Sequence, residues 1–161
     1  MEKRLKHLRH TPGSPDGGFT LIEVLIALLV LSIGLLGLAA LQVTGLRETQ
    51  MARMRTQAVL LTYDMADRMR ANTNQAANYV YDSADYPSGL PGGVAGADLT
   101  DWITNELQLL PDSSAEITNP AGSDYQITVR WNETRDPAVT GTDCPNNSAD
   151  DLPCYQLDLT L

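Results

Sequence analysis

Residues 17–41 read Gly17-Gly18-Phe19-Thr20-Leu21-Ile22-Glu23-Val24-LIALLVLSIGLLGLAAL, and this stretch decides the fold. From Val24 to Leu41 the only polar side chain is Ser32. An α-helix of this length rises about 27 Å, which is close to the hydrocarbon thickness of a bilayer. The stretch therefore predicts a membrane-spanning helix.

Glu23 stands immediately before the apolar run and needs a separate explanation. A carboxylate placed in hydrocarbon costs on the order of a few kcal/mol, so we expect it to have a functional partner. The alternative is that its side chain reaches the headgroups at the membrane interface, where the cost is small.

Length and charge limit what the rest of the chain can be. A chain of 161 residues leaves room for one small domain besides the membrane helix. Residues 19–161 carry 7 basic and 18 acidic side chains, whereas Lys3, Arg4, Lys6 and Arg9 precede the helix. This asymmetry predicts a cytoplasmic N-terminus and an exported, acidic C-terminal domain. Electrostatic binding of nucleic acid or of anionic lipid by that domain is therefore not expected.

The two cysteines, Cys144 and Cys154, lie ten positions apart in CPNNSADDLPC. A structural zinc site normally takes four ligands, and no histidine lies nearby. A disulfide is the preferred interpretation, provided that this part of the chain is outside the cytosol.

The same loop carries oxygen-bearing side chains that would suit calcium, a hard cation. Their spacing lacks the EF-hand order, so an acidic, solvated loop is the simpler interpretation. These residues are Asp143, Asn146, Asn147, Asp150 and Asp151.

Beyond Leu41 the helical pattern continues and becomes amphipathic. Its apolar stripe consists of Met51, Met54, Ala58, Leu61, Met65 and Met69. We expect one helix from about Thr20 to Arg70, ended by residues 72–74. We expect the stripe to pack in a core; a promiscuous, methionine-rich binding surface is the alternative.

Residues 75–97 are predicted to form a long irregular connection, because PSGLPGGVAGA is rich in Pro and Gly. Asp98 or Thr100 is expected to cap a short helix that Pro111 ends. Trp102 in this helix is expected to be a core anchor, whose indole N–H needs a partner if it is fully buried.

Alternating apolar and polar residues after Pro111 predict three strands, at 115–119, 125–131 and 155–161, with a turn over NPAGSD between the first two. The fold class is therefore α+β, with a long N-terminal helix packed on a small antiparallel sheet. The disulfide loop lies directly before the last strand and would pin it.

The sequence shows no convincing set of catalytic residues and no cofactor-binding motif. The only histidines, His7 and His10, belong to the basic leader, and there is no phosphate-binding loop or zinc ligand cluster. The sequence predicts neither an enzyme nor a cofactor.

The stretch GGFTLIEVLIALLVLSIGLLGLAALQ resembles the N-terminus of type IV pilins and of type II secretion pseudopilins. In that family a membrane prepilin peptidase cuts between the Gly and the Phe and then methylates the new amino group. The resemblance implies a cut after Gly18, N-methylation at Phe19, and Glu23 as the acidic fifth residue of the mature chain. The new amine and the Glu23 carboxylate would attract each other, within one subunit or between neighbours during assembly.

A narrower resemblance, to PilV-type minor pilins, rests on SIGLLGLAALQ, the D-L-x-x-W helix, the I-T-V-R-W strand and the late cysteine pair. It implies a low-copy subunit that joins other minor and major pilins at the inner-membrane assembly machinery. Such a subunit helps to initiate the pilus or forms its tip.

The sequence leaves two alternative functions open. One is a minor pseudopilin of a type II secretion system, which shares the N-terminal mechanism. The other is an unprocessed, membrane-anchored periplasmic enzyme or receptor.

Four parts of the chain follow from the patterns and the resemblance. Residues 1–18 are the basic leader, 19–46 the membrane and filament-core helix, 47–74 its amphipathic continuation, and 75–161 a periplasmic α+β region. The protein is expected to cross the inner membrane once before it enters the filament.

Overall fold

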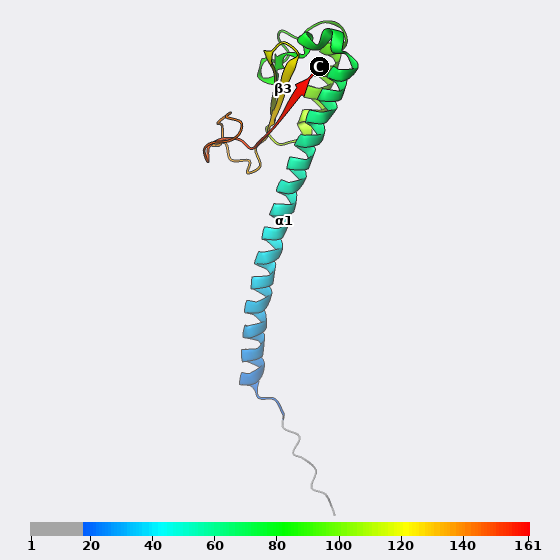
Figure 1. The fold of residues 1–161 in the computed structure, drawn as a ribbon. Helices are drawn as coiled ribbons and strands as arrows, with labels where there is room; N and C mark the ends of the chain where they lie inside the picture. Colours follow the sequence, from blue (N-terminus) through cyan, green and yellow to red (C-terminus); the bar gives the residue numbers. More distant parts are fainter. Residues whose placement is uncertain (1–17) are drawn as a thin grey trace, which may run out of the picture. The chain divides into compact units, whose positions relative to one another are not determined.

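The computed structural model describes residues 18–161, so residues 1–17 of the leader, with His7 and His10, lie outside the described residues. Two compact units adjoin between Thr44 and Gly45. Helix α1, Leu21–Ala71, contributes to both units (Figure 1). Its bounds agree with the predicted helix to within one residue at each end.

The described part of the first unit consists of the apolar part of α1 and the three residues before it. Its side-chain hydroxyls bond to the helix itself: the Ser32 hydroxyl donates to the Leu28 carbonyl at 2.7 Å and Thr44 donates to Ala40 at 3.2 Å. Such internal bonds let a polar side chain lie in an apolar surrounding without another partner.

The second unit has its own hydrophobic core, in which the C-terminal part of α1 meets a sheet. Four side chains of the apolar stripe are buried, namely Ala58, Leu61, Met65 and Met69, while Met51 and Met54 are half-buried. The prediction that the stripe packs in a core is confirmed.

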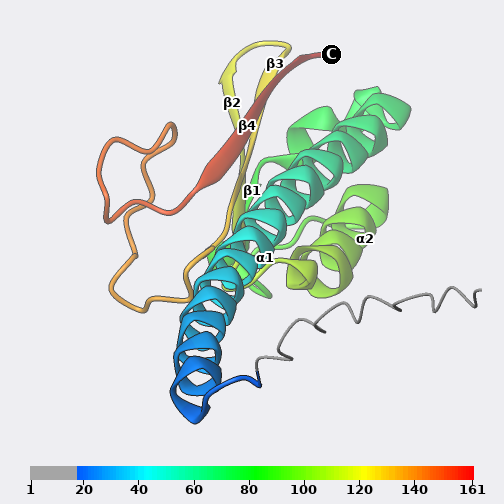
Figure 2. The same ribbon diagram turned by 90° about the horizontal axis from the view of Figure 1, so that it is seen from below.

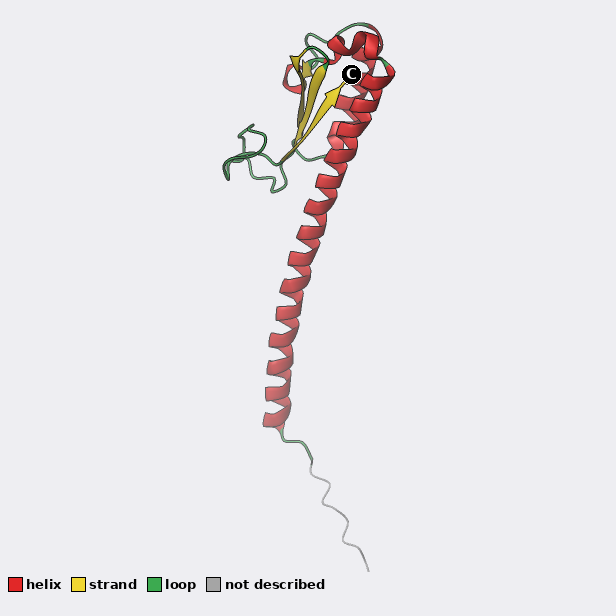
Figure 3. Ribbon diagram, in the orientation of Figure 1, coloured by secondary structure: helices red, strands yellow, loops and turns green. Residues whose placement is uncertain are grey.

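The sheet contains four antiparallel strands in the order β1-β2-β3-β4. Figure 3 shows them beside α1, and Figure 2 shows α1 with helix α2, Gly93–Asp101. The strands are β1 Tyr81–Asp82, β2 Ser114–Ala121, β3 Asp124–Arg130 and β4 Cys154–Thr160. An α+β fold with a small antiparallel sheet is therefore confirmed.

Alternate residues of β3 lie in the core, as the sequence pattern predicts. Tyr125, Ile127 and Val129 are buried against the core. On the other face, the Gln126 amide donates to Asp158 at 2.9 Å across the β3–β4 pair.

The region predicted as an irregular connection contains short ordered elements, so this prediction is wrong in part. Residues 73–79 form a 3₁₀ helix, and β1 pairs Tyr81 with Ile117 of β2. A two-residue strand has no readable period, and its pairing partner lies far along the chain. Sequence patterning therefore could not reveal it.

Helix α2 begins five residues earlier than the first predicted cap, with Gly92 at its N-cap position, so Asp98 and Thr100 are not caps. A Cβ at Gly96 would collide with the carbonyl oxygen of Pro91, so the glycine permits the close approach of the preceding loop. The helix then passes through a π-helical turn, Trp102–Glu106, and a 3₁₀ turn, Leu107–Leu109.

The predicted turn between the first two long strands is shorter than expected. Strand β2 continues through Pro120 to Ala121, with a register shift after Thr118. Gly122 makes the turn with a φ of 58°, a backbone conformation that glycine adopts without strain.

Candidate functional site

Thr20 caps the entry into α1. The Thr20 carbonyl accepts a hydrogen bond from the Glu23 backbone N–H at 3.1 Å, and the Thr20 hydroxyl oxygen lies 3.3 Å from the same nitrogen. Thr followed three residues later by Glu is the spacing that satisfies the free N–H groups of a first helical turn. A carboxylate in the first turn is also stabilised by the positive end of the helix dipole. The T-x-x-E spacing is the local sequence signal that could have identified Thr20 as the cap.

Phe19 and Gly18 precede the helix, and Phe19 is 82% exposed. In the uncut chain the Phe19 nitrogen is a peptide amide, which carries no charge for Glu23 to meet. A cut after Gly18 would convert that nitrogen to a cationic amine four positions before Glu23. The charge pair therefore remains a prediction for the processed chain.

The apolar surface that follows is uncovered by the rest of the described chain. Seventeen large apolar side chains between Phe19 and Leu46 are 46–85% exposed. Burying each would gain about 1.5–3 kcal/mol, or about 25–50 kcal/mol in all. That exceeds the roughly 5–15 kcal/mol by which a domain is stable, so this surface requires a membrane or other subunits.

Gly34 and Gly37 lie within this uncovered surface. No other part of the described chain comes within 4 Å of the place where a Cβ would stand on either residue. Small residues of this kind let a second helix approach closely. We expect Gly34 and Gly37 to face neighbouring helices; ordinary glycine content of a membrane helix is the alternative interpretation.

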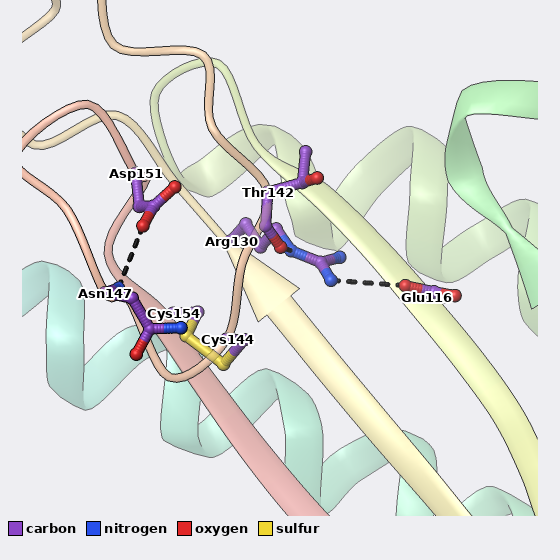
Figure 4. The surroundings of a disulfide bond; sticks show 7 residues. All are labelled: Glu116, Arg130, Thr142, Cys144, Asn147, Asp151 and Cys154. Atoms are coloured by element: carbon purple, nitrogen blue, oxygen red, sulfur yellow. Dashed lines mark hydrogen bonds and ion pairs between the residues drawn. A yellow bond between two sulfur atoms is a disulfide. The ribbon is translucent and has the colours of Figure 1, made fainter.

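Figure 4 shows the disulfide between Cys144 and Cys154, with their Cα atoms 6.0 Å apart. The Arg130 guanidinium of β3 donates to the Thr142 carbonyl at 2.8 Å and pairs with Glu116 at 3.2 Å. Since Cys154 begins β4, the disulfide and Arg130 together fasten the loop to two strands of the sheet.

Asp151 uses its carboxylate to order the same loop. It accepts the backbone N–H groups of Asn147 at 2.8 Å and Ser148 at 2.7 Å. These hydrogen bonds hold the pKa of Asp151 below its ordinary value. Within residues 18–161, no group of three His, Cys, Asp or Glu side chains is placed to hold a metal ion.

Arg68 of α1 is the centre of an ionic cluster that sequence reasoning missed. Its guanidinium pairs with Asp64 at 2.7 Å, with Asp101 at 3.0 Å and with Glu106. Only the spacing between Asp64 and Arg68 is readable from the sequence, because the other two carboxylates come from the α2 region. The cluster joins that region to α1.

Burial and pairing act in opposite directions on the carboxylates of this cluster. Hydrogen bonds from Asn105 and Arg68 lower the pKa of Asp101. Burial raises the pKa of Glu106, because one guanidinium shared among several carboxylates does not offset the loss of solvent.

Two family models match the chain in sequence order. Residues 14–39 match the prokaryotic N-terminal methylation motif, and residues 40–88 match type IV pilin Tt1218. No curated protein and no solved structure matches the chain.

An apolar helix that carries a methylation motif and continues into a small α+β domain defines a pilin-like fold. Together the two matches support a type IV pilin-like protein. This family consists of structural subunits and is not an enzyme family. The motif implies processing by a prepilin peptidase and assembly with other pilins.

Proposed function

We propose that this chain is a minor prepilin of a type IV pilus, of the PilV type. The proposal rests on one observation. The methylation motif, residues 14–39, overlaps the apolar part of α1 in sequence, and nothing else in the described chain buries the surface of that part. A soluble monomer would leave that surface in water, whereas a membrane and then a filament would each cover it. The cut follows Gly18, and Phe19 becomes the methylated N-terminus.

Glu23 then has two successive roles in the proposal. In the precursor its carboxylate lies in the first turn of α1, where the positive end of the helix dipole favours a negative charge, and Thr20 caps that turn. In the processed chain it meets the amine of Phe19, its own or that of a neighbouring subunit, and so fixes the axial position of an incoming subunit. Opposite charges attract strongly in a surrounding of low dielectric constant.

The region after residue 74 is the displayed part of the subunit. In the proposed topology the N-terminus is cytoplasmic and the domain periplasmic, which supports formation of the Cys144–Cys154 disulfide. The subunit joins other minor and major pilins at the inner-membrane machinery and acts in initiation or at the tip.

Intact mass measurement of the protein extracted from membranes tests the processing step. We expect a chain that begins with N-methylated Phe19. Gly18→Leu should retain the leader, while the matched control Gly13→Leu should be cut normally. A wild-type chain that retains Met1 would overturn the proposal and favour an unprocessed, membrane-anchored protein.

Co-purification from native membranes tests the assignment to a pilus. We expect pilins and pilus assembly components to accompany the full chain. Recovery with the components of a type II secretion system would instead identify a minor pseudopilin.

A further inference from the structure

Two exposed arginines follow the apolar run of α1 without a partner of their own. Arg47 is the first charged residue after Glu23, and Arg53 lies six positions further on. Neither forms an ion pair within residues 18–161. Exposed guanidinium groups at this position are free to take an external anion.

Most of the other arginines in the second unit are already engaged. Arg55 pairs with Glu133 at 3.0 Å, Arg70 with Asp67 at 2.7 Å and Arg130 with Glu116 at 3.2 Å. Arg68 pairs with the carboxylates of its own cluster. Among the arginines of the second unit, only Arg135 shares with Arg47 and Arg53 the lack of an ion pair within the described residues.

Charge changes sharply along the chain beyond the apolar run. Residues 47–55 contain three arginines and one carboxylate, Glu48, whereas residues 56–161 contain four arginines and 16 carboxylates. Glu48 acts electrostatically on Arg55. An anionic surface would attract this short segment and repel the remainder of the domain.

The chemistry of the two side chains indicates which anion they take. Guanidinium groups bind phosphate oxygens through paired N–H donors, and they are weakly hydrated. A lipid phosphate is the anion found where an apolar, membrane-length helix leaves the hydrocarbon. We propose that Arg47 and Arg53 bind the phosphate groups of anionic phospholipids at the distal end of the membrane-spanning run.

This inference rests on the membrane-resident stage of the proposed function. A headgroup contact by each arginine contributes roughly a fivefold preference for an anionic over a neutral lipid. The two contacts fix how far α1 enters the bilayer while the acidic domain stays clear of the surface.

Native mass spectrometry of the full chain in nanodiscs tests the inference. Discs would contain phosphatidylglycerol and phosphatidylcholine in equal amounts, and the lipids retained after release would be counted. We expect phosphatidylglycerol on the wild type. In Arg47→Gln/Arg53→Gln the preference should fall by about twentyfold or more. Arg70→Gln and Arg135→Gln are the matched controls and should retain it.

Each outcome separates the inference from the proposed function. Equal phosphatidylglycerol retention by the double variant and the wild type overturns the inference, as does equal retention of both lipids by the wild type. A chain that fails to insert into the discs would instead overturn the membrane stage of the proposed function, and the inference with it.

Discussion

The indole N–H of Trp102 donates to the backbone carbonyl of Leu61 at 3.1 Å, and both residues are buried. This bond joins the π-helical turn after α2 to the middle of the amphipathic part of α1. The predicted core anchor therefore has the hydrogen-bond partner that a buried indole needs.

Trp102→Ala should lower the free energy of unfolding by about 3–5 kcal/mol, because it leaves a cavity and removes the bond. Trp102→Phe keeps most of the volume and should cost about 1–2 kcal/mol. Denaturant unfolding of the detergent-solubilised chain, followed by circular dichroism, measures both. Leu109→Ala is the control, since Leu109 is 63% exposed and should change little. Equal stability of Trp102→Ala and the wild type would contradict the role of the anchor.

Long periodic elements were predictable from the sequence because their signals are local. The apolar run and the 3.6-residue period that follows it predicted α1, and the alternation of Tyr125, Ile127 and Val129 predicted β3. The start of α2 was missed because Gly92 and Gly93, which usually break helices, here stand at its N-terminus. Strand β1 and the Arg68 cluster depend on contacts between distant parts of the chain.

The candidate site was predictable to a different degree. Gly18, Phe19 and Glu23 were recognised from a family motif, whereas the cap at Thr20 was available from local spacing alone. Glu23 is predicted to meet the cationic amine of Phe19. That amine forms only by cleavage, so the charge is absent from the uncut chain.

Arg68→Ala should destabilise the domain by about 1–2 kcal/mol. The substitution leaves the partly buried carboxylate of Glu106 without its counter-ion, which is costlier than losing an exposed pair. Arg70→Ala is the matched control: its pair with Asp67 is on the surface and is expected to contribute at most about 0.5 kcal/mol. Thermal unfolding in detergent compares the two, and equal shifts would show that the cluster does not stabilise the fold.

Glu106 should make the domain more stable as the pH falls from neutral toward 4.5, the ordinary pKa of a glutamate. Its raised pKa means that the folded state takes up a proton more readily than the unfolded state in this window. Below pH 3.8, the ordinary aspartate value, the lowered pKa of Asp101 acts oppositely, and stability is lost. Unfolding midpoints measured across pH 3–8 would trace both effects.

Glu106→Gln should remove the gain between neutral pH and pH 4.5, because an amide has no proton to take up. Glu48→Gln is the control, since Glu48 is exposed and lies outside the Arg68 cluster. If Glu106→Gln keeps the wild-type pH dependence, another group is responsible.

Glu23→Val should be cut after Gly18 yet enter filaments about tenfold less often or worse. Loss of an ion pair worth at least about 1.4 kcal/mol in an apolar surrounding corresponds to that factor. The ratio of variant to wild-type subunit in sheared pili, measured by quantitative mass spectrometry against the membrane pool, gives the result. Glu48→Gln, on the same helix beyond the apolar run, should incorporate normally. Normal incorporation of Glu23→Val would rule out the charge pair and leave the favourable interaction with the helix dipole as the role of this carboxylate.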